Sequence, residues 1–170
     1  MLSSILKKSD CASCKFCCSF RRQSLWETPI FDAESVEKLK KIYPAVKFRK
    51  AGNTSFTFDI SDQYKTDDSQ EEAACPFLDT KSGCILPSDL KPFDCSIWPF
   101  RAVKSKDDTA GKVQVALTPT CPAINKVARE KITNLIDSGL GKKILDYAEN
   151  HPDIIKDSSE FLSDIVYRKA

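Results

Sequence analysis

CPFLDTKSGCILPSDLKPFDCSIWPF, residues 75–100, combines three cysteines with prolines spaced so closely that regular structure is repeatedly interrupted. Proline lacks a backbone N–H and restricts the residue before it, so neither a continuous helix nor a central strand fits this segment. The segment therefore needs a source of order other than helix or sheet hydrogen bonds. Metal ligation by its cysteines would supply that order, and the stretch predicts a fold organised around metal.

A second cysteine-rich stretch, CASCKFCC, occupies residues 11–18. A C-x2-C turn lets two thiolates approach one cation, which is why this spacing occurs in both zinc and iron–sulfur sites. Cys17 and Cys18 are adjacent, so a disulfide between them would be strained, and ligation of different metals or different edges of one cluster suits them better. Free cysteine also packs as a small hydrophobe, so one or two thiols can be plain core residues. The predicted metal ligands are Cys11, Cys14, Cys17, Cys18, Cys75, Cys84, Cys95 and Cys121.

The only histidine, His151, follows a predicted helix and is interpreted as a surface or helix-capping residue. The site is therefore predicted to be all-cysteine. Sulfur ligands suit zinc, iron and iron–sulfur clusters, whereas magnesium and calcium prefer oxygen. The sequence leaves open whether the cysteines form two four-thiolate sites or one site with bystanders.

Charge and hydropathy limit the classes of partner. The 26 basic and 24 acidic residues nearly cancel, which gives no support for nucleic-acid or membrane-surface binding. No run approaches the roughly 20 apolar residues that span a bilayer, and no secretory signal pattern opens the chain. We therefore expect a cytoplasmic protein, and in that reducing compartment clustered cysteines indicate metal or redox chemistry rather than the alternative of a disulfide framework.

Apolar periodicity predicts secondary structure around the cysteines. An amphipathic pattern with Asp32 as cap and Pro44 as stop predicts a helix over residues 31–43. Alternating patterns predict two hairpins, and the polar stretch 61–74 is expected to be a surface loop. The first hairpin pairs residues 46–50 with 55–60, and the second pairs 101–104 with 113–117. Further helices are predicted over residues 123–137, with Gly139 as the C-terminal cap, and over 142–149 and 159–168.

These elements predict an α+β fold: a small, metal-organised single domain with short antiparallel strands in the middle and a helical C-terminal third. Within it, residues 1–122 are expected to form the cysteine-cluster metal-binding region. Residues 123–170 contain no cysteine and are expected to be its helical cover.

The cysteine segments together resemble the YkgJ-like CxxCxxCC family of zinc- or iron-chelating proteins. The resemblance covers roughly the first 120 residues, with its motifs in matching order. They are CASCKFCC, CPFLD from Cys75, Gly83-Cys84-Ile85, KPFDCSIWPF from Lys91, and Cys121-Pro122. The resemblance implies a metal-chelating cysteine cluster, and a related cysteine pattern occurs in flagellin lysine N-methylases.

Three functions follow as expectations. The first is a metal-binding protein that holds an iron–sulfur cluster, with [4Fe–4S] as a candidate form, for a redox or electron-transfer role. The second is a structural zinc module that supports interaction with a protein partner, which the sequence does not identify. The third, by analogy alone, is a protein linked to lysine N-methylation. Enzyme activity, as an iron–sulfur oxidoreductase or a methylase-like protein, stays open.

Overall fold

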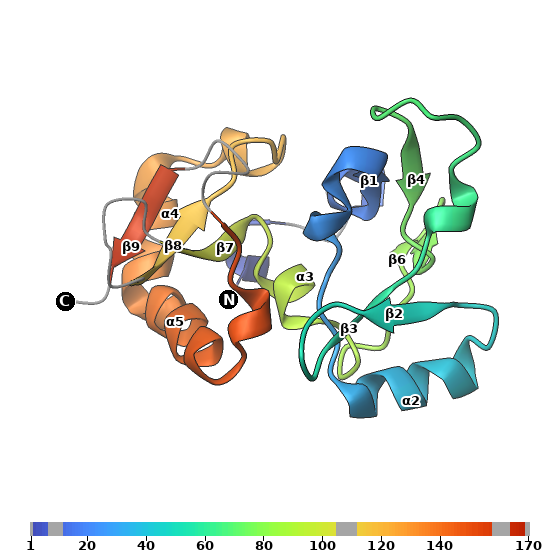
Figure 1. Ribbon diagram of the computed structural model, residues 1–170. Coiled ribbons are helices and arrows are strands. Elements are labelled where there is room, and N and C mark those ends of the chain that lie inside the picture. Colours follow the sequence, from blue (N-terminus) through green and yellow to red (C-terminus); the bar gives the residue numbers. More distant parts are fainter. Residues whose placement is uncertain (1, 7–11, 105–111, 158–163, 169–170) are drawn as a thin grey trace. The chain divides into compact units, whose positions relative to one another are not determined.

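Figure 1 shows the computed structural model, which describes residues 2–6, 12–104, 112–157 and 164–168. The α+β class predicted from the sequence is confirmed. The chain divides into two compact units, which we call the inserted unit (Lys15–Cys95) and the flanking unit (Met1–Cys14 with Ser96–Ala170). These boundaries follow contacts in the fold, whereas the predicted division at residue 122 followed the distribution of cysteines.

Helix α2 (Ala33–Ile42) belongs to the inserted unit and confirms the helix predicted there. The Asp32 side chain caps it by accepting a hydrogen bond from the Ser35 N–H at 2.7 Å. Val36 and Leu39 share its buried face, and the helix ends at Tyr43, before Pro44. Sequence periodicity and both end signals therefore specify this element together.

The strands of the inserted unit form three separate two-stranded pieces. The predicted hairpin is confirmed as β2 (Phe48–Lys50) with β3 (Phe56–Phe58). Strand β1 (Ser19–Arg21) pairs with β4 (Glu72–Ala74), and β5 (Leu78–Asp79) pairs with β6 (Gly83–Cys84). The 3₁₀ turns are η2 (Phe16–Cys18), η3 (Arg22–Glu27) and η4 (Ser61–Gln63).

The expectation of a surface loop over residues 61–74 is wrong at its ends. The segment begins with η4 and finishes with β4. Ala73 lies opposite Phe20 in the β1–β4 pair and is buried with it, so one apolar residue in a polar stretch carries a strand into the core. Glu71 closes the loop between η4 and β4, because its carboxylate accepts hydrogen bonds from the backbone N–H groups of Lys65 and Thr66.

Aromatic rings form the core of the inserted unit. Phe77 is fully buried, and its ring centroid lies 5.4 Å from that of Tyr43 and 6.2 Å from that of Phe58. Phe31 and Phe48 stand at 6.0 and 6.3 Å from the same ring. Cys75 packs against this cluster, so the aromatic core adjoins the cysteine segments.

The described part of the flanking unit contains one three-stranded sheet in the order β7 (Phe100–Lys104), β8 (Val113–Leu117), β9 (Asp164–Arg168). Both pairs are antiparallel, and β7–β8 confirms the second predicted hairpin. Helix α5 (Gly141–Asn150) packs against β7 and β8 and confirms the helix predicted over 142–149 (Figure 1). The short helix α3 (Phe93–Ile97) contains the boundary between the units.

The helix predicted over residues 123–137 is interrupted. Its first part is a 3₁₀ turn, η5 (Ile124–Lys126), after which Val127 and Ala128 take extended ψ values of 132° and 134°. The α-helical part is α4 (Arg129–Leu135), followed by the π-helical turn η6 (Ile136–Leu140). Gly139, the predicted cap, has a φ of +120° and marks the junction with α5.

The helix predicted over residues 159–168 is wrong where the structure describes it. Residues 158–163 lie outside the described residues, and 164–168 form β9 instead. Ile165, Val166 and Tyr167 are β-branched or aromatic, and pairing with β8 suits them better than a helix. The C-terminal third is therefore helical only in part.

Candidate metal centre

The structure distributes the cysteines unequally between the units. Cys11 lies outside the described residues, while Cys14 and Cys121 belong to the flanking unit. The inserted unit holds the other predicted ligands: Cys17, Cys18, Cys75, Cys84 and Cys95. All seven described cysteines are free thiols. The inserted unit is therefore the sulfur-rich one.

Backbone hydrogen bonds hold the cysteine segments of the inserted unit together. The Cys75 N–H donates to the Cys18 carbonyl at 2.7 Å, extending the β1–β4 ladder by one residue. Cys84 lies opposite Leu78 in β5–β6, and the next residue, Ile85, donates from its N–H to the Phe77 carbonyl at 3.0 Å. Segments more than fifty residues apart in the sequence are thus fixed side by side.

Lys15 adds a side-chain link between the first segment and the β5–β6 turn. Its backbone is left-handed, with a φ of 55°, and its Nζ donates to the Thr80 carbonyl at 2.7 Å. In that turn the Asp79 carboxylate accepts from the N–H groups of Lys81 and Ser82 at 2.9 and 2.7 Å. Asp79 therefore stabilises the turn between β5 and β6.

The thiols influence one another electrostatically. A side-chain hydrogen bond with Cys18 and burial raise the pKa of Cys17 far above its usual value. Burial raises the pKa of Cys75 to about 12, and the neighbouring Cys84 and Cys17 contribute in the same direction. Burial also raises the pKa of Cys95, with smaller contributions from Asp94, Cys75 and Cys17. Five thiols thus form one electrostatically linked group, which we call the thiol group.

The cysteine side chains have the arrangement of free thiols. Within residues 2–6, 12–104, 112–157 and 164–168, no set of three or more His, Cys, Asp or Glu side chains is placed to hold a metal ion. The side-chain donor atoms of the thiol group are nevertheless all sulfur. Soft or borderline cations such as zinc and iron prefer such donors.

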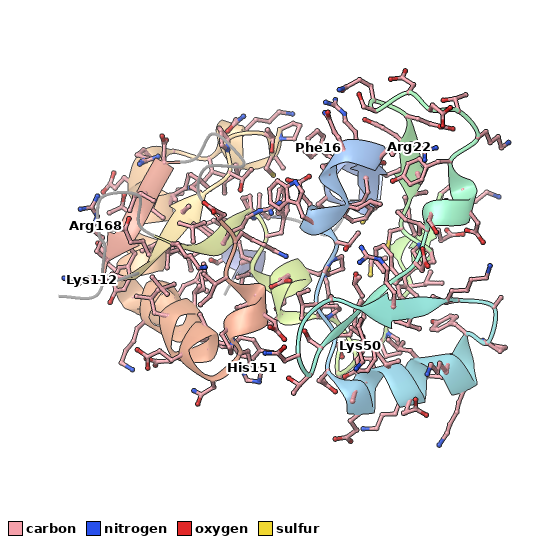
Figure 2. All side chains as sticks on the ribbon, in the orientation of Figure 1. Phe16, Arg22, Lys50, Lys112, His151 and Arg168 are labelled. Carbon is pink, nitrogen blue, oxygen red and sulfur yellow. The ribbon has the colours of Figure 1, made fainter. Side chains whose placement is uncertain are left out.

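His151 and several charged residues have local structural roles. His151, which is labelled in Figure 2, caps α5, so the capping interpretation is confirmed. Its Nδ1 lies 3.0 Å from the Tyr147 carbonyl oxygen, and its ring stacks on the Tyr147 ring with 3.9 Å between the centroids. Asp94 accepts a hydrogen bond from the Ile30 N–H at 3.1 Å. Arg21 pairs with Glu72 at 3.3 Å, and the Arg22 guanidinium lies 4.7 Å from the centre of the Tyr64 ring.

Sequence reasoning missed the lysines near the thiol group. The Cys18 hydrogen bond and burial raise the pKa of Cys17, and burial raises that of Cys95, while the positive charge of Lys91 acts weakly in the opposite direction on both. Lys15 contacts the turn before Cys84, as described above. In the sequence, Lys91 opens the motif KPFDCSIWPF, four residues before Cys95, and this position does not indicate where its side chain lies.

Comparisons with protein families, curated proteins and solved structures find no match. The resemblance to the YkgJ-like family therefore stays a prediction. In the part of the chain that the structure describes, no helix is both long and apolar enough to cross a bilayer.

Proposed function

We propose that this protein binds metal through the thiol group of its inserted unit, with an iron–sulfur cluster as the preferred occupant and a redox or electron-transfer role. The observation that carries the proposal is the electrostatic linkage of five thiols drawn from four separate segments of the chain. Buried, protonated thiols have little reactivity of their own, whereas sulfur donors gathered from separate segments suit the ligation of a soft or borderline cation.

Cys17, Cys18, Cys75, Cys84 and Cys95 are the residues that would hold the group, and sulfur ligation suits both iron–sulfur clusters and zinc. When bound, an iron–sulfur cluster supplies one-electron redox chemistry. Backbone hydrogen bonds already hold the segments that carry Cys18, Cys75 and Cys84 side by side. The adjoining aromatic core, with Phe77 at its centre, would limit access of water from that side.

Binding would also release protons. Metal ligands must be thiolates, and burial raises the pKa values of Cys17, Cys75 and Cys95, so these groups are protonated at neutral pH in the free protein. Lowering the pH therefore weakens metal binding, because each proton competes directly with the metal.

Anaerobic purification followed by metal, acid-labile sulfide and visible absorption measurements tests the proposal. The expected result is a coloured protein containing iron and sulfide, whose absorption bleaches on reduction with dithionite. Cys75→Ser should remove most of the metal, whereas Ser19→Ala, one residue after Cys18, should leave it unchanged. A colourless protein with stoichiometric zinc would favour the structural module instead, and a metal-free protein after reconstitution would contradict metal binding altogether.

A further inference from the structure

Lys15 has a backbone conformation that few residues adopt. Its φ of 55° lies in the left-handed region, and in the part of the chain that the structure describes it is the only non-glycine residue with a positive φ. Glycine adopts this conformation without the steric cost that a Cβ atom brings. A strained residue persists only where surrounding contacts hold it, so the contacts of Lys15 are informative.

Two hydrogen bonds of Lys15 connect neighbouring and distant parts of the inserted unit. Its carbonyl accepts from the Cys18 N–H at 2.9 Å and so begins the 3₁₀ turn η2. Its Nζ donates to the Thr80 carbonyl at 2.7 Å, although the two residues are 65 positions apart. At the other end of η2, the Cys18 carbonyl accepts from the Cys75 N–H. The turn is thus held at its end by backbone and at its start by the Lys15 side chain.

The β5–β6 turn is a firm anchor for this ammonium. The Asp79 carboxylate accepts hydrogen bonds from the Lys81 N–H, the Ser82 N–H and the Ser82 hydroxyl, at 2.9, 2.7 and 2.8 Å. The Thr80 carbonyl therefore belongs to a turn that its own side chains fix. The bond from the ammonium consequently holds η2 in place rather than shaping the β5–β6 turn.

The turn η2 carries two thiols that are only partly covered. Cys17 and Cys18 are half-buried, whereas the Phe16 ring, labelled in Figure 2, is 45% exposed. A single 3₁₀ turn of three residues has poor hydrogen-bond geometry and little stability of its own. Its opening therefore depends on the contacts that hold its two ends.

We propose that Lys15 is a clasp, whose ammonium holds η2 against the β5–β6 turn and thereby limits the access of reagents in solution to the Cys17 and Cys18 thiols. The role is conformational and is independent of what these thiols bind. It therefore goes beyond the proposed function, and failure of either proposal leaves the other intact.

Alkylation of the reduced, chelator-treated protein with iodoacetamide, followed by mass spectrometry, measures access to each cysteine. Lys15→Met keeps the apolar stem but removes the donor. It should raise the alkylation rate of Cys17 and Cys18 about three- to tenfold, the range expected for loss of one partly exposed hydrogen bond. Lys15→Arg retains a donor and should return the rate towards that of the wild type. Lys81→Met removes an exposed ammonium from the same β5–β6 turn and should leave the rate unchanged.

Lys15→Gly separates the side chain from the backbone, because glycine adopts the left-handed conformation freely but offers no ammonium. It should raise the alkylation rate as Lys15→Met does. A wild-type rate in either variant would overturn the clasp, since the backbone alone would then close η2. An equal rise at Cys95 and Cys121, with a matching fall in the free energy of unfolding, would also overturn it, because the substitution would then act on the whole fold.

Discussion

The two units reach order by different means. The flanking unit has one sheet with five-residue strands and a helix packed on it, so its hydrogen bonds and its apolar burial support each other. The inserted unit has only two-stranded pieces with strands of two or three residues, each of which would be marginal alone. The inserted unit therefore depends on the packing of its aromatic core more than on sheet hydrogen bonds.

Of the substitutions that test this difference between the units, removal of the Phe77 ring should have the largest effect on stability. Phe77→Ala deletes the ring that contacts four other aromatic rings, and the lost burial and the cavity together should cost about 3–5 kcal/mol. Urea unfolding measures the loss, and hydrogen exchange should place it in residues 15–95. Phe16→Ala, which alters a ring that is 45% exposed (Figure 2), should change stability little. Equal loss of protection in β7 and β8 would show that the aromatic core does not belong to the inserted unit alone.

Gly141→Ala probes the flanking unit. An added Cβ would lie 2.5 Å from Cγ of the Tyr167 ring, so the ring of β9 must shift, and we expect a loss of about 1–3 kcal/mol. Thermal unfolding of Gly141→Ala, Tyr167→Ala and the double variant forms a cycle. The loss of unfolding free energy in the double variant should be smaller than the sum of the losses in the two single variants. Strict additivity would mean that the clash is relieved elsewhere.

The cap of α2 should give a smaller effect that depends on pH. Asp32→Ala removes the bond to the Ser35 N–H and should cost about 1 kcal/mol at pH 7. Burial favours the neutral carboxyl, but the hydrogen bonds from Ser35 outweigh it and lower the pKa of Asp32. A lowered pKa means that the contribution is present above the unfolded-state pKa of about 3.9 and is lost as the pH falls through the folded-state value.

Asp32→Asn separates the two parts of that prediction. Asparagine caps helices about as well as aspartate, so stability at pH 7 should stay near that of the wild type, while the acid-dependent loss disappears. Urea denaturation between pH 2 and pH 7 measures both. An unchanged acid profile in Asp32→Asn would assign the pH dependence to another carboxyl.

Removal of a surface ion pair from either unit should change the melting temperature least of all. Glu34 precedes Lys38 in α2, at 2.7 Å, whereas Lys142 precedes Asp146 in α5. The acidic residue is better placed towards the helix N-terminus, so Glu34→Gln should lower the melting temperature slightly more than Asp146→Asn. Both shifts should stay within about 2 °C and disappear in 1 M NaCl. A larger shift for Asp146→Asn would reverse the expected order.

Much of the fold could be predicted because local signals agreed with it. Asp32 and Pro44 bounded α2, and alternating apolar residues specified β2–β3 and β7–β8. The β1–β4 pair was missed because strands of three residues give no periodicity, and their partner lies about fifty residues away. At β9, the helical spacing of apolar residues competed with β-forming side chains, and pairing with β8 decided the outcome.

For the candidate site, the sequence indicates the sulfur donors but not the residues around them, and metal binding stays a prediction. Cysteine is scarce enough that its spacing alone singled out the segments around Cys17 and Cys75. Lysine is common, and only the folded structure shows that the Lys15 ammonium donates to the Thr80 carbonyl in the β5–β6 turn.

The order of the units along the chain has a consequence for biosynthesis. The inserted unit is one continuous stretch, whereas the flanking unit needs β9, which follows residue 163, before its sheet is complete. At about 5–20 residues per second, a ribosome takes several seconds to make the chain between Cys95 and β9. During that interval the thiol group has already emerged with its own aromatic core. Under the proposed function, metal loading would begin on the nascent chain, before the segment that forms β9 has been made.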